Sequence, residues 1–180
     1  TTGFQNVTNN QLITVFSSGA FLIIAMCMAI GGSSGSTAGG IKLSRIGLIA
    51  KSMVSTIKET LSPSTARVSV RYYHLGRKVL TTDAAKSAMT VSALFVVTYL
   101  IGSLAGIAHG YDAISSIFES VAMASNGGLS SGIVSRGMPP TLEAVYILEM
   151  WAGRLEFVTL LALVVKVVVS IAPRRKVVRS

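Results

Sequence analysis

The chain has 180 residues, of which 51% are hydrophobic and only 13% are charged. Soluble domains carry roughly 25% charged residues, so this composition predicts an integral membrane protein with lipid as its surroundings. The formal net charge of +9 is typical of nucleic-acid binding. However, the basic residues are separated by apolar segments and do not share one face with aromatic side chains. This arrangement argues against a nucleic-acid partner.

The first apolar segment runs from Leu12 to Ile30 without a charge. A helix of that length reaches about 28 Å and predicts a membrane span. A segment of small residues follows, which we call the Gly/Ser stretch. Non-helical backbone at membrane depth is tolerated only inside protein or beside a water-filled cavity, so we interpret this segment as the moving part of an ion pathway. Its members are Gly31, Gly32, Ser33, Ser34, Gly35, Ser36, Thr37, Ala38, Gly39 and Gly40.

An amphipathic pattern begins at Ile41, and Pro63 is expected to end the helix that it predicts. The polar segment 62–86 follows, in which the alternation from Val68 to Tyr72 indicates a short strand or hairpin. The helix has apolar residues at helical spacing, namely Ile46, Ile49, Met53 and Ile57.

Two further spans are predicted, from Ser87 to Ala108 and from Leu142 to Ile171. The first carries small residues at Gly102 and Gly106, a spacing that favours close helix packing. Between the spans, residues 112–124 form a segment with one apolar side that is too short to cross a bilayer.

Lysine and arginine residues predict the orientation. Nine of the 16 lie between Lys42 and Lys86, four lie in the tail from Arg174, and one, Arg136, lies between the two spans. The positive-inside rule places the segment 42–86 and the C-terminal tail in the cytoplasm, in a multi-pass protein of the cytoplasmic membrane. Four acidic residues then fall near the outer face, where we expect solvated carboxylates that together enrich cations at an outer mouth: Asp112, Glu119, Glu143 and Glu149.

A short helix followed by glycine-rich backbone is typical of a cation filter. Successive carbonyl oxygens replace the water shell of the ion, and Gly127 and Gly128 give the backbone after Asn126 the freedom that this requires. The negative end of the helix dipole faces the cation. An outer re-entrant loop without ion contact is the alternative. Because Thr1-Thr2-Gly3-Phe4 also precedes a span, we predict an all-α tandem repeat of span, pore helix, filter and span.

Arg154 lies inside the last predicted span, and an arginine at membrane depth is a functional candidate. Glu156 is two residues away and therefore on another face of the helix, so each side chain needs a partner on another helix. The alternative is a buried interhelical ion pair with a structural role.

The chain resembles the Trk/Ktr/HKT superfamily of potassium transporters, specifically the C-terminal portion of a TrkH-type subunit. Four motifs occur in family order: Thr1-Thr2-Gly3-Phe4, Gly35-Ser36-Thr37-Ala38-Gly39-Gly40-Ile41-Lys42, Asn126-Gly127-Gly128-Leu129 and Gly153-Arg154-Leu155-Glu156.

The resemblance implies four pseudo-symmetric repeats around one pore. Residues 1–61 would end the third repeat, 62–86 would form a cytoplasmic connector, and 87–180 would form the fourth repeat. The Gly/Ser stretch, lying beneath the filter, and Arg154 would form the gate. The resemblance also implies a homodimer that docks onto cytosolic nucleotide-binding regulatory subunits. The filter residues for the transported potassium ion would be Thr1, Thr2, Gly3, Asn126, Gly127 and Gly128.

The leading hypothesis is therefore potassium uptake without covalent chemistry and without a further cofactor. A sodium-permeable or sodium-coupled transporter of the same superfamily is one alternative. The other is a membrane enzyme or assembly subunit that uses Arg154 and Glu156, for which the sequence lacks a paired nucleophile and base or a set of metal ligands.

Overall fold

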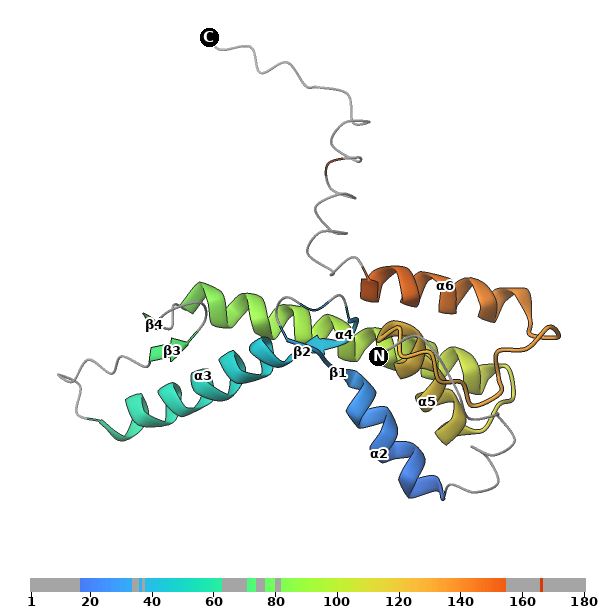
Figure 1. The fold of residues 1–180 in the computed structure, drawn as a ribbon, viewed down its shortest axis with the longest axis horizontal. Helices are drawn as coiled ribbons and strands as arrows, with labels where there is room; N and C mark the ends of the chain where they lie inside the picture. Colours follow the sequence, from blue (N-terminus) through green and yellow to red (C-terminus); the bar gives the residue numbers. More distant parts are fainter. Residues whose placement is uncertain are drawn as a thin grey trace, which may run out of the picture.

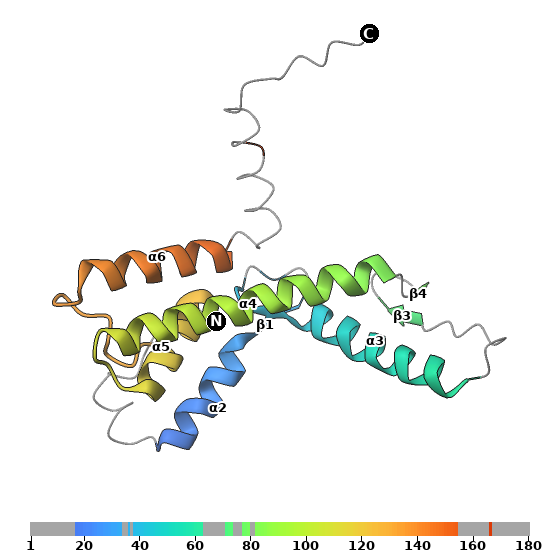
Figure 2. The same cartoon turned by 180° about the vertical axis from the view of Figure 1, so that it is seen from behind.

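The computed structural model describes residues 17–33, 36, 38–62, 71–73, 77–79, 82–154 and 166. Helices dominate this part of the chain, as predicted, and two short strand pairs accompany them. Helix α4 runs through the molecule, with α3 along one half and α2, α5 and α6 around the other (Figures 1 and 2). The elements are α2 (Ser18–Ala29), β1 (Ile30–Gly31), β2 (Ile41–Lys42), α3 (Leu43–Leu61), β3 (Arg71–Tyr73), β4 (Arg77–Val79), α4 (Thr82–Ala108), α5 (Ala113–Ala124) and α6 (Pro140–Arg154).

Helix α2 is shorter than the sequence predicted. Ser17 has extended backbone angles (φ −69°, ψ 160°), and its Oγ accepts a hydrogen bond from the amide of Ala20 at 3.4 Å. This N-cap starts the helix at Ser18, because a serine side chain can satisfy an amide that the first turn leaves unpaired. Residues 12–16 of the predicted span lie outside the described residues. At 1.5 Å per residue the helix is about 18 Å long, less than the bilayer core.

Helix α4 is long and apolar enough to cross a membrane, and among the described residues it is the one helix that meets both conditions. Its small residues face its neighbours: a Cβ added to Gly106 would lie 2.7 Å from Ser116 Oγ of α5 and 3.1 Å from Tyr146 Oη of α6. The predicted close packing at the Gly102–Gly106 segment is therefore confirmed. The opposite side exposes large apolar side chains, including Val96, Val97, Leu100, Ile101 and Leu104.

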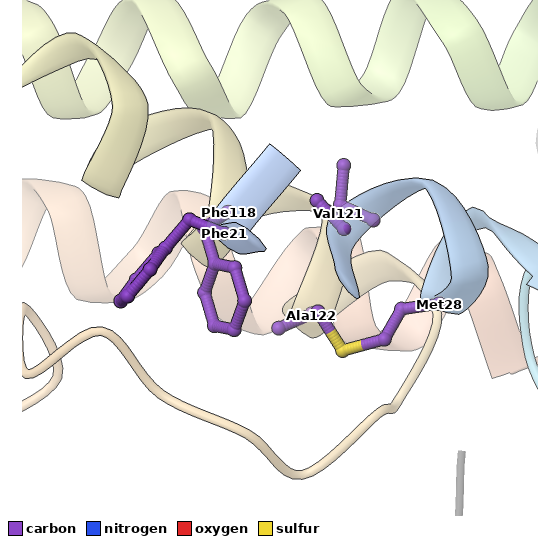
Figure 3. Packing of buried hydrophobic residues seen from close by; sticks show 6 residues of the cluster. Phe21, Met28, Phe118, Val121 and Ala122 are labelled. Atoms are coloured by element: carbon purple, nitrogen blue, oxygen red, sulfur yellow. The ribbon is translucent and has the colours of Figure 1, made fainter. Parts of the chain in front are cut away.

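Helix α5 lies at the centre of the packing and contacts α2, α4 and α6. The rings of Phe118 on α5 and Phe21 on α2 are 4.8 Å apart between centroids and tilted by 51° (Figure 3). Such a pair contributes about 1 kcal/mol beyond the apolar area that it buries. Ala25, Met28, Val121 and Ala122 complete this core cluster, so the predicted short helix packs against α2 through a hydrophobic core.

Helix α3 lies beside α4 and ends at Leu61, two residues before Pro63, as the sequence predicted. Strands β3 and β4 pair antiparallel with Arg71 opposite Val79 and Tyr73 opposite Arg77. This pair confirms the predicted hairpin and lies near the start of α4 (Figure 1).

Candidate functional site

The candidate site begins with the N-terminus of α5. Asp112 precedes the helix, and its Oδ2 accepts hydrogen bonds from the amides of Ile114 at 3.1 Å and Ser115 at 3.3 Å. A carboxylate in this position satisfies two unpaired amides and interacts favourably with the positive end of the helix dipole. The exposed Asp112 side chain thus fixes where the short helix starts.

The C-terminus of α5 closes in a Schellman motif. The amide of Gly127 donates to the carbonyl of Ala122 at 2.8 Å, and the amide of Asn126 donates to the carbonyl of Met123 at 3.0 Å. Asn126 has φ +52°, the left-handed conformation that this motif needs and that asparagine tolerates better than most residues. The chain therefore turns sharply away from the helix axis at Asn126.

Residues 125–132 form what we call the filter loop. Gly128 and Gly132 adopt φ values of +80° and +94°, which side-chain-bearing residues rarely adopt. Gly127 approaches α2 so closely that an added Cβ would lie 2.8 Å from Met28 Sδ. The loop departs from regular structure while its backbone is held close to neighbouring helices.

Strands β1 and β2 close the neck of the Gly/Ser stretch. They pair in parallel, with Ile30 opposite Ile41 and Gly31 opposite Lys42, and the amide of Leu43 donates to the carbonyl of Gly32 at 3.2 Å. This pair cannot be predicted from the sequence, because two-residue strands leave no periodic pattern. The Gly/Ser stretch is thus a loop between α2 and α3 whose two ends lie side by side.

The Gly/Ser stretch and the filter loop touch each other. A Cβ added to Gly39 would lie 2.5 Å from the carbonyl oxygen of Ser125 and 3.1 Å from Asn126 Nδ2. Gly153 of α6 approaches the same end of α5, because its added Cβ would clash with the carbonyl oxygen of Ala124. Glycine at both positions lets two segments distant in sequence reach the backbone at the C-terminus of α5.

Arg154 is the last residue of α6 and borders a cavity of about 160 Å³. Lys42 and Arg45 line the same cavity, together with Gly40 of the Gly/Ser stretch and Phe95 of α4. Three cationic side chains therefore gather beside this stretch.

Two of the four acidic residues expected at the outer face are buried, which corrects the prediction of solvated carboxylates. Glu119 is 0% exposed and Glu149 is 3% exposed. Glu149 Oε1 lies 3.0 Å from Ser120 Oγ, while its Oε2 is buried without a hydrogen-bond partner among the described residues. The prediction failed because the partners of these carboxylates come from segments distant in sequence. Asp112 and Glu143 are exposed, as expected.

Several predicted site residues lie outside the described residues: Thr1, Thr2, Gly3, Ser34, Gly35 and Thr37. The second filter segment and its position relative to the filter loop are therefore predictions from the sequence alone.

The fold is similar to that of a solved membrane transporter. The crystal structure of the potassium transporter TrkH from Vibrio parahaemolyticus matches with a TM-score of 0.65 and 24% sequence identity, covering 82% of this chain and 31% of that chain. The helices thus have the arrangement found in part of that transporter.

Sequence comparisons agree with the fold. An uncharacterized cation transporter of Methanocaldococcus jannaschii is 35% identical over 162 residues, covering 90% of this chain and 33% of its own length. The Trk system potassium uptake protein TrkH of Escherichia coli K12 is 32% identical over 145 residues, covering 78% of this chain and 29% of its own length. The chain spans about a third of the length of these relatives.

The family described as TrkH, cation transport protein, matches residues 1–172. The chain belongs to this family of cation transporters.

Proposed function

We propose that this chain takes part in potassium uptake across the cytoplasmic membrane, as part of a transporter that conducts the ion through a filter of backbone carbonyls. One observation carries the proposal: the loop at the C-terminus of α5 combines left-handed backbone at Asn126 and Gly128 with close contact to the Gly/Ser stretch. Carbonyls freed from regular hydrogen bonding are what a cation needs in place of water.

The surroundings of the loop support this function. Helix α5 directs the negative end of its dipole toward the loop, which favours a cation there. Helix α4 is apolar enough to cross a membrane and exposes large apolar side chains. The named relative from Escherichia coli is a potassium uptake protein, which favours potassium as the transported ion.

The Gly/Ser stretch and Arg154 would form the gate. Gly39 contacts the start of the filter loop, and Gly40 and Arg154 line one cavity. An arginine beside the path repels cations, so its position relative to the stretch would control flux. In this proposal residues 1–61 and 87–180 belong to consecutive repeats, 62–86 is a cytoplasmic connector, and the C-terminal tail is cytoplasmic.

The full-length protein would assemble as a homodimer with cytosolic nucleotide-binding regulatory subunits. The basic segment 42–86 has the charge to contact such a subunit.

The filter is tested by Gly128→Ser in the full-length protein reconstituted into liposomes. A side chain at φ +80° costs about 1–2 kcal/mol and moves the neighbouring carbonyls, so we expect the potassium-to-sodium permeability ratio to fall. Gly137→Ala is the control, because Gly137 is exposed and an added Cβ would have nothing within 4 Å. An unchanged ratio in Gly128→Ser would contradict the filter, and a wild-type preference for sodium would favour a sodium transporter.

The gate is tested by Arg154→Ala, for which we expect a higher rate of potassium flux at an unchanged permeability ratio. Removing the positive charge lowers the electrostatic barrier beside the Gly/Ser stretch. Flux equal to that of the wild type would remove Arg154 from the gate.

A further inference from the structure

Glu119 is a buried carboxylate in the middle of α5 to which no role has so far been given. It is 0% exposed, and burying a carboxylate is costly unless hydrogen bonds replace its water. The side chain of Ser131 and the backbone amide of Ser131 each donate to Oε2 at 2.6 Å, and Ser130 Oγ donates to Oε1 at 2.8 Å. Both carboxylate oxygens are therefore occupied by donors from one short segment.

The donors follow the filter glycine closely. Ser130 and Ser131 come two and three residues after Gly128 and lie in the filter loop. Hydrogen bonds at 2.6–2.8 Å to a charged acceptor are among the strongest that side chains make. Ser131 is itself only 4% exposed, so water does not compete for the two bonds that Ser131 makes to Glu119.

Two anchors on the same helix thus bracket the filter segment. The Schellman bonds of Asn126 and Gly127 to the carbonyls of Met123 and Ala122 hold its start. Glu119 holds its end, through Ser130 and Ser131. Gly128 lies between the two anchors, and the carbonyls of Asn126, Gly127 and Gly128 are those proposed to meet the ion.

We infer that Glu119 is a positioning residue that sets ion selectivity by fixing the far end of the filter loop on α5. This inference rests on the filter function proposed above. Selectivity between potassium and sodium depends on where the carbonyls stand and how far they can move. A carboxylate that holds the loop through a backbone amide limits that movement without contacting the ion.

A purely structural role for Glu119 makes a different prediction. A buried acid that only stabilises the fold would change the melting temperature when replaced and leave the permeability ratio of the folded protein unaltered. A positioning residue changes the ratio in protein that still folds, and its effect is transmitted through Ser131. The two roles are therefore separable in one set of variants.

The experiment measures the potassium-to-sodium permeability ratio of the full-length protein in liposomes, together with its melting temperature in detergent. Glu119→Gln keeps the size of the side chain but replaces one acceptor oxygen by a donor group. Since this leaves a buried donor without its acceptor, we expect the ratio to fall about tenfold. Ser131→Ala removes one of the three bonds and keeps the amide, so its ratio is expected to fall less.

A double variant and two further controls complete the design. If Glu119 acts through Ser131, the combined effect of Glu119→Gln and Ser131→Ala is smaller than the product of the two single effects. Glu119→Asp keeps the charge on a shorter side chain and should recover part of the ratio. Glu143→Gln removes an exposed carboxylate from α6 and should leave the ratio unchanged.

The possible outcomes separate this inference from the function on which it rests. A reduced ratio in Gly128→Ser with wild-type ratios in Glu119→Gln and Ser131→Ala would overturn the role of Glu119 and leave the filter intact. A wild-type ratio in Gly128→Ser would remove the filter itself. If Glu119→Gln does not fold, Ser131→Ala decides: a reduced ratio supports the inference, and an unchanged ratio refutes it.

Discussion

The two glycine-bearing segments that meet at the C-terminus of α5 are held in different ways. The filter loop is bound at both ends to one helix, by Schellman bonds at Asn126 and by the buried carboxylate of Glu119. The Gly/Ser stretch is closed at its neck by the backbone pair of β1 and β2. Among its described residues, Ser36 Oγ accepts a local hydrogen bond from the amide of Ala38 at 3.1 Å.

Because of this difference, the filter loop can stay fixed on α5 while the Gly/Ser stretch, in the proposed function, moves against it. A loop tied to a buried charge moves only if strong hydrogen bonds break. A loop tied at its neck can shift as a body while the neck stays closed. Under the proposed function, the first segment selects the ion and the second segment gates its passage, and the following substitutions test this division.

The largest effect is expected for Gly153→Ala. The added methyl group would clash with the carbonyl oxygen of Ala124, a backbone atom that cannot rotate away. Overpacking of this kind should destabilise the protein by about 3 kcal/mol and abolish most of the transport. Melting temperature and potassium flux would be measured, with Gly137→Ala as the matched control in open space. Wild-type stability would show that α6 does not press on the end of α5 in the way described.

Gly39→Ala should separate the two segments at their contact. Its Cβ would lie 2.5 Å from the carbonyl oxygen of Ser125, so the Gly/Ser stretch has to move away at a cost of about 2 kcal/mol. Because the proposed function makes the stretch the gate, we expect the flux to rise while the potassium-to-sodium permeability ratio is unchanged.

Gly47→Ala on α3 is the matched control for this variant, since nothing lies within 4 Å of its added Cβ. There alanine should stabilise the helix by about 0.8 kcal/mol and leave the flux unaltered. A lower permeability ratio in Gly39→Ala would contradict the division of roles between the two segments.

Asn126→Ala should weaken the turn into the filter loop. Alanine at φ +52° is strained by about 1.5 kcal/mol, whereas glycine is not. We expect Asn126→Ala to lower the permeability ratio and Asn126→Gly to retain it, as measured in liposomes. Equal ratios in both variants would mean that the backbone at this turn does not control selectivity.

The smallest effect is expected for Asp112→Ala, at the far end of α5. Loss of the N-cap should cost about 1 kcal/mol of stability, seen as a lower melting temperature. Asp112→Asn keeps the accepting oxygen and should recover most of it. A changed permeability ratio in either variant would show that selection is sensitive to the whole helix and not only to its anchored end.

The sequence was sufficient to predict several of the helices and insufficient to predict what they pack against. The apolar side of residues 112–124 predicted α5, and the spacing of Gly102 and Gly106 predicted close packing, because periodicity records which side of a helix is buried. The amphipathic pattern after Ile41 predicted α3 in the same way. Each of these predictions depended on residues that are near one another in the chain.

The burial of Glu119 and Glu149 could not be predicted from nearby residues. A charged residue in an outer segment is usually solvated, and nothing local to Glu119 indicates that Ser130 and Ser131 fold back onto it. The partner of Glu149, Ser120, lies on a different helix. Contacts between helices depend on tertiary packing, so the burial of these acids could be learned only from the structure.

The parallel pairing of β1 with β2 has a consequence for engineering. Parallel strands are normally joined by a dozen or more residues. Here β2 pairs with β1 after a connection formed by residues 32–40. Residues 32–40 form a loop between the two paired strands. The length of this loop does not determine where α2 ends or where α3 begins. The loop offers a place to insert a fluorescent or spin-labelled reporter that tests the proposed gate while the β1–β2 pair keeps the flanking helices in place.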